Sequence, residues 1–473
     1  RVPLSVGFAH RHLRSARPLA LHNRHRRTMH KARGLSSIAP AVRRAQPEAF
    51  QVLSRKPGPR TSAEANVVHN MSPGPGALPL SVLHKAQQEL VSWPSAPGQS
   101  VMSVSHRETN SPYQKLAAKV MQQVRDVLDV PRGYHVLFMH GGAHGQFAAV
   151  PLNLAGGGAL TPDAPRARCT AVDTGFWARR AAAEHAKYVD VSWGASSSSA
   201  EPIAAGASDG TLRDWRGATA GTHTRLPPSS AWGYGASDAF VHICANETIH
   251  GIEFTSDPSL PGSAPPLVAD FTSNLLSRPV DVSKYGVIYA SGGKNLGPAG
   301  VTLVLVKDEL LSQGREHPLC PSFLSYSQMA HSQPQANLYL TPPTFNVYMV
   351  GLMLEWVTAH GGLQAAERRS VSRAAKLYEV IDASRGFYHN LVEHAARSRM
   401  SVPFRIDGSA SRSPLDSEKL ERAFLAEAEA AGFRSLAGHP LVGGVRASLY
   451  HGVPDASVDA LATFMRRFCK KYQ

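Results

Sequence analysis

Short apolar segments that alternate with helical stretches restrict the fold of this chain more than any other feature. They have strand-like lengths and read HVLFMHGG (135–142), CTAVDT (169–174), AFVHICA (239–245), PLVADFT (266–272), YGVIYAS (285–291) and VTLVLVK (301–307). Strands that alternate with helices along a chain form a mostly parallel sheet covered by helices. The sequence therefore predicts an α/β layer.

Helical periodicity is clearest before and between these segments. Residues 111–130 carry one apolar stripe with a spacing of four residues, formed by Leu116, Val120, Val124 and Leu128. A second amphipathic helix is predicted within 70–90, after a turn-rich start, and a third over QFAAVPLNLAG (146–156).

The rest of the chain divides into parts of different composition. A smaller α+β domain is predicted over 344–473, with helices at 346–360, 363–382 and 457–472 and strands at 400–406 and 445–450. The large domain is expected over 67–343. It is interrupted at 193–235 by a stretch rich in Gly, Ser, Ala and Thr, which predicts a surface excursion that is partly mobile.

The basic charge of the chain is concentrated near its start. The formal net charge is +15, but residues 1–60 hold 14 Lys and Arg against one acid, Glu48, so the remainder is nearly neutral at +2. This distribution argues against a basic groove for nucleic acid. A leader rich in Arg, His, Ser and Ala is typical of a transit peptide, so residues 1–66 predict delivery to a plastid or mitochondrion rather than the cytoplasm. The alternative is a disordered basic tail that binds polyanions.

Membrane and metal sites find no support in the sequence. The longest apolar run, VYMVGLMLEWV (347–357), is too short to span a bilayer and contains a glutamate. The four cysteines are scattered without the spacing of metal ligands. Neither a membrane partner nor a bound metal is predicted.

One lysine stands out in the stretch YGVIYASGGKNLGPAG (285–300). Lys294 follows a strand-like segment and is surrounded by small residues. Most lysines are solvated surface residues, and taken alone Lys294 can be one of them. A phosphate loop is excluded, because that signature needs a longer glycine-spaced loop with Ser or Thr after the lysine, and Asn295 follows here.

Several polar groups share with Lys294 a position just beyond a strand: residues 141–144 (Gly-Gly-Ala-His), Thr248 and Asp270. Ligands of open α/β sheets bind at these carboxyl ends. A buried lysine amine is nucleophilic and can hold a carbonyl cofactor, while Asp270 can pair with a pyridinium nitrogen. Pyridoxal phosphate chemistry requires this combination. Its phosphate would suit the glycine turn, whose amides point outward at a helix start.

Trp177, which follows another strand, is placed to stack on the cofactor ring. Each of these residues also has an ordinary explanation. Asp270 can be a helix cap, Trp177 a core residue and the glycine pair a simple turn. Only their shared location favours the cofactor hypothesis.

The chain from Asn70 onward resembles phosphoserine aminotransferases, which are class V, fold-type I enzymes that use pyridoxal phosphate. The matching segments follow the order of that family and are NMSPGPGALP, SVSHRE, VLFMHGGAHGQFAAVPLNL, DTGFWARRAAAEHAKY, NETIHGIEF, ADFTSNLLSRPVDVSKYGVIYA, KNLGPAGVTLVLVKDELL, TPPTFNVYMVGL, RSRMSVPF and GGVRASLY. The resemblance implies a seven-stranded, mostly parallel sheet with flanking helices, a smaller C-terminal domain and a homodimer.

The resemblance also implies a role for each site residue. Lys294 would bind the cofactor as a Schiff base and shuttle a proton, and Asp270 would keep the pyridine nitrogen protonated. The other cofactor contacts implied are Trp177, Thr248, Ala143, His144 and, toward the partner subunit's cofactor, Thr341. The implied substrate ligands are His106 and Arg107 for the distal phosphate or carboxylate, Arg397 for the phosphate and Arg446 for the α-carboxylate.

The reaction implied is transfer of an amino group from L-glutamate to 3-phosphohydroxypyruvate, which gives O-phospho-L-serine and 2-oxoglutarate. Four positions depart from the family pattern: Pro73, His144, Gly293 and Leu340. Lost hydrogen-bond donors at 293 and 340 predict a cofactor held more loosely, by about one to a few kcal/mol. The alternatives are a related class V aminotransferase with another substrate, or a weakly active pseudo-enzyme with a binding role.

Overall fold

The computed structural model describes residues 68–156, 166–198, 223–312 and 314–473. The strands are β1 (His69–Asn70), β2 (Tyr134–Met139), β3 (Arg168–Asp173), β4 (Asp190–Ser196), β5 (Val241–Cys244), β6 (Asn246–Glu247), β7 (Ile252–Glu253), β8 (Leu267–Asp270), β9 (Val287–Ser291), β10 (Thr302–Lys307), β11 (Tyr388–His389), β12 (Ser401–Ile406), β13 (Phe433–Arg434) and β14 (Val445–Ser448). The α-helices are α2 (Leu80–Glu89), α3 (Pro112–Leu128), α4 (Gly142–Leu154), α5 (Phe176–His185), α6 (Tyr326–Ala330), α7 (Thr344–Ala359), α8 (Gly362–Asp382), α9 (Ser417–Ala430) and α10 (Asp455–Tyr472).

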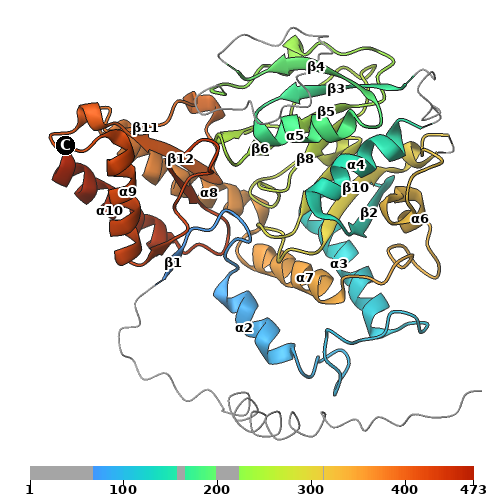
Figure 1. The fold of residues 1–473 in the computed structure, drawn as a ribbon. Coiled ribbons are helices and arrows are strands. Elements are labelled where there is room, and N and C mark those ends of the chain that lie inside the picture. Colours follow the sequence, from blue (N-terminus) through green and yellow to red (C-terminus); the bar gives the residue numbers. More distant parts are fainter. Residues whose placement is uncertain (1–67, 157–165, 199–222, 313) are drawn as a thin grey trace, which may run out of the picture. The chain divides into compact units, whose positions relative to one another are not determined.

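A seven-stranded sheet forms the centre of the large part of the chain (Figure 1). Its strand order is β2-β10-β9-β8-β5-β3-β4. The pairs from β9 to β4 are parallel, and β10 runs antiparallel to both of its neighbours. The prediction of a mostly parallel seven-stranded sheet with flanking helices is therefore confirmed.

Successive side chains of each strand enter two different cores, because a strand alternates its faces with a period of two. In β10, Leu303 and Leu305 pack with α3 and α7, whereas Val304 and Val306 pack with α4, α5 and α6. Helices therefore cover both faces of the sheet, and the apolar strands detected in the sequence are buried on both sides.

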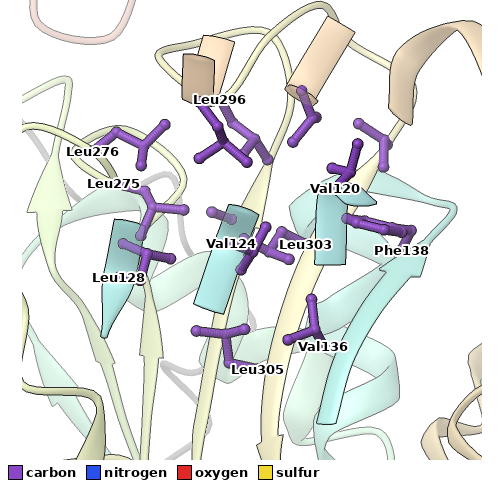
Figure 2. Close-up of a cluster of buried hydrophobic side chains, with 14 of the residues drawn as sticks. Val120, Val124, Leu128, Val136, Phe138, Leu275, Leu276, Leu296, Leu303 and Leu305 are labelled. Atoms are coloured by element: carbon purple, nitrogen blue, oxygen red, sulfur yellow. The ribbon is translucent and has the colours of Figure 1, made fainter. Parts of the chain in front are cut away.

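Helix α3 shows why its residues form this element. Ser111 caps its first turn by accepting a hydrogen bond from the Gln114 backbone N–H at 3.2 Å, and the left-handed Asp129 ends it. The predicted apolar stripe is confirmed, since Val120 and Val124 are fully buried. Figure 2 shows Val120 near Phe138 of β2, Val124 near Leu303 of β10, and Leu128 near Leu275.

The C-terminal part has a core of its own. The strands β11, β12 and β14 form a three-stranded antiparallel sheet, which packs with α8, α9 and α10. Helix α7 belongs instead to the first core, through Val347 to Val357, and the change of core falls between Leu363 and Ala374. The sequence placed the domain boundary at 343/344, whereas the two hydrophobic cores meet further along the chain. The boundary itself stays a prediction.

One sequence expectation needs correction. The surface excursion predicted at 193–235 starts too early, because β4 continues to Ser196 and pairs with β3, and Trp193 is 2% exposed. Small Gly, Ala and Ser residues hid this strand. The middle of the predicted excursion, 199–222, lies outside the described residues. In the described part of the chain, no helix is long and apolar enough to cross a bilayer.

Buried neutral histidines couple the stability of the fold to pH. His451 is 5% exposed, and its Nε2 donates a hydrogen bond to the Leu276 carbonyl at 2.9 Å. Burial lowers the pKa of His451 to about 3. In the unfolded chain the His451 ring takes up a proton near pH 6.5, whereas in the folded protein it stays neutral down to a pH of about 3. His451 therefore contributes stability above pH 6.5 that is lost as the pH falls.

Replacing His451 with glutamine should flatten this dependence, because glutamine retains a donor and does not titrate. Between pH 6.5 and 5, we expect the free energy of unfolding to fall by about 2 kcal/mol less in His451→Gln than in the parent. Denaturant unfolding at both pH values measures the difference. The exposed His84→Gln is the matched control, and equal slopes in all three proteins would contradict the assignment.

Candidate active site

A cavity of about 230 Å³ opens at the carboxyl ends of β5, β8 and β9, where α4 and α5 begin. Its lining comes from segments that are far apart in the sequence: Gly142, Ala143, His144, Trp177, Cys244, Asn246, Thr248, Asp270, Thr272, Ser273, Ser291, Gly292 and Lys294. Six of the predicted cofactor residues are among them, namely Ala143, His144, Trp177, Thr248, Asp270 and Lys294. The structure therefore brings together residues that the sequence had only placed at separate strand ends.

Lys294 lies in the turn that follows β9 and is half-buried. Its Nζ donates a hydrogen bond to the Pro73 carbonyl and lies 5.2 Å from the centre of the Tyr450 ring. Gly74 provides the room for the amine, since a Cβ at that position would sit 2.6 Å from Nζ. A side chain at residue 74 would push the amine aside.

Asp270 ends β8 and is 6% exposed. Burial raises the pKa of its carboxyl group to about 6, although hydrogen bonds from Thr272 and the charge of Lys294 act in the opposite direction. Its Oδ1 accepts the backbone N–H of Thr272 at 2.8 Å. A buried carboxylate of this kind is ionised at neutral pH and stabilises a positive charge in the cavity.

Trp177 is fixed at the start of α5 from two sides. Its indole Nε1 donates to the Thr248 hydroxyl at 3.0 Å, and its backbone N–H donates to the Glu247 carboxyl at 3.1 Å. The other Glu247 oxygen accepts the Ala178 N–H at 2.8 Å. Glu247 is fully buried, and this burial raises its pKa to about 8. The indole and the Thr248 hydroxyl therefore reach the cavity as one rigid unit.

The glycine turn before α4 is the third wall of the cavity. Gly141 has a φ of +89° and Gly142 a φ of +65°, in the left-handed region that favours glycine. This turn ends β2 and starts α4, so the first-turn amides of Gly142, Ala143 and His144 have no partner within the helix. Such amides bind anions.

These three walls fit pyridoxal phosphate. The Lys294 amine suits an aldehyde, the buried Asp270 carboxylate suits a protonated ring nitrogen, and the helix start suits a phosphate. Trp177 supplies an aromatic face beside them. The chemistry of the donors, rather than any single residue, supports this cofactor.

Arg446 approaches the cavity from β14 and is 7% exposed. Its Nη1 donates to the Thr248 carbonyl at 3.2 Å, and its buried Nε has no hydrogen-bond partner in the described parts of the chain. Burial lowers the pKa of the guanidinium. A buried cation with a free Nε donor is suited to a carboxylate.

The other predicted substrate and cofactor ligands lie elsewhere in the chain. His106 is half-buried with its ring edge-on to Tyr113, Arg107 is exposed, and neither lines the cavity. Thr341 is exposed, and its carbonyl accepts from His140 Nε2 at 3.1 Å. The roles of His106, Arg107 and Thr341 stay predictions.

Arg397 is engaged within the C-terminal part. Its guanidinium makes two hydrogen bonds to Asp382, at 2.7 and 2.9 Å, and lies 4.8 Å from the centre of the Tyr378 ring. It does not line the cavity. A role in phosphate binding would require the guanidinium to exchange Asp382 for the substrate, so this role also stays a prediction.

Sequence reasoning missed several residues at the site. Asn246 and Ser273 line the cavity and are hydrogen-bonded to each other at 2.8 Å. Asn246 stands two residues before Thr248, so the same strand end was a signal for it. His439 lies in an irregular segment near Arg446, and burial and then this arginine lower its pKa. No strand or glycine pattern marks His439 in the sequence.

The structure gives a physical reason for one departure from the family pattern. Gly293 has a φ of +100°, and its amide donates to the Gly297 carbonyl at 2.7 Å. A glutamine at this position would be strained in the same backbone conformation. The substitution Gly293→Gln would therefore change the backbone as well as add a hydrogen-bond donor. At the second departure, the Leu340 side chain packs beside the second core and has no donor.

Comparisons with known proteins agree with this geometry. The aminotransferase class-V family profile matches residues 230–461. The phosphoserine aminotransferase of Ralstonia nicotianae is 40% identical over 403 residues, which cover 85% of this chain and 95% of that protein. The solved phosphoserine aminotransferase of Bacillus circulans subsp. alkalophilus has a TM-score of 0.71 and 33% identity, over 86% of this chain and 99% of that one. The pyridoxal-phosphate-bound enzyme of Trichomonas vaginalis has a TM-score of 0.70 and 31% identity, over 85% and 100%.

Proposed function

This chain belongs to the phosphoserine aminotransferases, within aminotransferase class V, and we propose that it transfers the amino group of L-glutamate to 3-phosphohydroxypyruvate. The products are O-phospho-L-serine and 2-oxoglutarate, so the reaction is a step in L-serine biosynthesis. The observation that carries this function is the convergence of Lys294 and Asp270 in one cavity, with Trp177 and an open helix start beside them.

The residues of the cavity divide the work among them. Bound pyridoxal phosphate supplies an electron sink for the bonds to the substrate α-carbon. Lys294 would hold the cofactor through its amine and, once free, would take the proton from the α-carbon of glutamate and later deliver one to the carbon that receives the amino group. Asp270 keeps the pyridine nitrogen protonated, because its pKa of about 6 leaves it ionised at neutral pH.

Both substrates are anions, so the site needs cationic side chains in addition to the residues that line the cavity. Glutamate and 3-phosphohydroxypyruvate both carry a carboxylate next to the reacting carbon. We propose Arg446 as its ligand, because this buried guanidinium lies against Thr248 and its Nε has no partner in the described parts of the chain. The distal phosphate of one substrate and the distal carboxylate of the other need a second cationic site. His106, Arg107 and Arg397 are proposed for it.

The choice of substrate tests this function directly. Purified holoenzyme should convert glutamate to 2-oxoglutarate with 3-phosphohydroxypyruvate as acceptor, and far more slowly with hydroxypyruvate, which lacks the phosphate. Equal use of the two acceptors would favour a related class V aminotransferase with another substrate. Absence of turnover with either acceptor would favour a pseudo-enzyme.

A homodimer is proposed to complete the site. Arg107 and Thr341 are exposed and His106 is half-buried, and none of them lines the cavity of its own chain. A second copy can supply them across a two-fold interface, where each subunit contributes the same surface. An exposed cation, Arg107, that makes no ion pair with the described residues supports this arrangement.

Mixing two inactive variants tests it. If Arg107 acts across the interface, Lys294→Ala and Arg107→Ala subunits that are unfolded and refolded together should recover about a quarter of the parent activity. Half of the refolded dimers then contain one subunit of each variant, and each of these dimers has one intact site out of two. Each variant refolded alone is the control, and a mixture as inactive as the separate variants would place Arg107 in its own chain's site.

The basic leader is proposed to direct import into an organelle. The support is compositional: 14 Lys and Arg against one acid over residues 1–60. A fusion of residues 1–66 to a fluorescent protein tests the proposal, because the fusion should enter plastids or mitochondria. A fusion that stays in the cytosol would favour the polyanion-binding tail.

A further inference from the structure

Three side chains with metal-binding atoms meet at one edge of the large sheet, and none of them lines the cofactor cavity. They are His135, Asp308 and His331, whose ligand atoms all lie within 4.8 Å of one another. We propose that these three residues bind a zinc ion, with water in the fourth position. This site is separate from the residues that carry the proposed aminotransferase function.

The fold creates this cluster from distant segments. His135 lies on the edge strand β2, which pairs with β10 so that His135 stands opposite Val306. Asp308 follows two residues later, where β10 ends. His331 ends α6, which packs beside β2 (Figure 1). The imidazole rings of His135 and His331 are 5.4 Å apart between their centres.

The hydrogen bonds around the cluster leave the right atoms available. His331 Nδ1 lies 3.1 Å from the Ser327 carbonyl and 3.4 Å from the Ser327 hydroxyl. In the tautomer that donates from Nδ1 to the carbonyl, Nε2 keeps a lone pair for a metal. Such a second bond orients a histidine for metal binding. His135 Nε2 faces Asp308 Oδ1 at 2.7 Å.

Two imidazoles and one carboxylate are a ligand set that zinc uses when a fourth position stays open. Bonds of about 2.0 to 2.2 Å place neighbouring ligand atoms about 3.3 Å apart. For zinc to bind, the 2.7 Å distance between His135 Nε2 and Asp308 Oδ1 must increase slightly, and the longer distances between ligand atoms must decrease. The cluster allows this, because the Asp308 side chain is 65% exposed, that of His135 is 25% exposed, and His331 is exposed.

Zinc titration of the holoenzyme tests the site. The protein is first dialysed against a chelator, and zinc chloride uptake is followed by isothermal titration calorimetry in the parent, His331→Ala and Asp308→Asn. The parent should bind one more equivalent of zinc than His331→Ala, or bind that equivalent more than about 10-fold more tightly. Asp308→Asn should show the same loss.

The matched control is His84→Ala, an exposed histidine on α2 that should leave zinc binding unchanged. Histidines of the leader are present in every variant, so their zinc binding cancels in the comparison. Equal stoichiometry and affinity in the parent, His331→Ala and Asp308→Asn would overturn the proposal. The readout is zinc uptake itself, so its outcome is independent of whether the chain is an active aminotransferase.

Discussion

Replacement of Lys294 by alanine should abolish transamination, with a fall in kcat of at least about 10⁴-fold. The substitution removes two functions of Lys294. The cofactor loses its covalent anchor, and the substrate α-carbon loses the base that takes its proton. Among the described residues, Lys294 is the only lysine that lines the cavity, so none of them offers a neighbouring amine for either task.

Activity and absorbance spectra measured together distinguish loss of chemistry from loss of folding. Lys294→Ala should fold, since its side chain fills a cavity rather than a core, and should lose the absorbance band of the lysine-bound cofactor. Lys284→Ala, at an exposed position in the same part of the chain, is the control and should behave as the parent. If Lys294→Ala kept both the band and glutamate turnover, the assignment of the site would be wrong.

The second large effect is expected at Asp270. The substitution Asp270→Asn retains the shape and removes the charge, so the protonated pyridine nitrogen loses its buried partner. Loss of one member of a buried charge pair costs about 4 kcal/mol, which corresponds to about 10³-fold in kcat. Asp126→Asn, at an exposed position on α3, is the control. A kcat within about 10-fold of the parent would contradict the role of Asp270.

The pH dependence of cofactor binding separates this charge effect from a change in shape. In the cofactor-free protein, burial raises the pKa of Asp270 to about 6. As the pH falls from 7.5 to 5.5, the Asp270 carboxylate of the parent takes up a proton. That proton must leave when the protonated pyridine ring of the cofactor binds. The dissociation constant for pyridoxal phosphate should therefore rise more in the parent than in Asp270→Asn, and equal rises would count against the ionised carboxylate.

Local patterns accounted for much of the fold. The stripe at Val120 and Val124 predicted α3, and apolar runs predicted β2, β3, β5, β8, β9 and β10 within a few residues of their bounds. Both signals come from residues that are neighbours in the sequence, where periodicity reports which face is buried. Strand β4 was missed, because its serines and glycine lack that signal and its stability comes from pairing with β3.

Part of the site could be predicted in the same way. Lys294, Asp270 and Thr248 stand at strand ends, and parallel strands bring their carboxyl ends to one edge of a sheet. Arg397 shows the limit of this reasoning. Its neighbour in space is Asp382, 15 residues earlier, and only the packed C-terminal part shows that the two form an ion pair. His439 was missed because it lies in irregular chain without a periodic pattern.

The α/β class and the family could be predicted from the sequence alone, and so could the candidate lysine and aspartate of the cavity. These features depend on short stretches of chain whose spacing and composition are legible without the fold. Three features became visible only in the folded chain: the order of the strands, the room that Gly74 leaves for the Lys294 amine, and the meeting of His135, Asp308 and His331 at one edge of the sheet. Strand order and packing depend on contacts between residues that are far apart in the chain, and no local pattern specifies them.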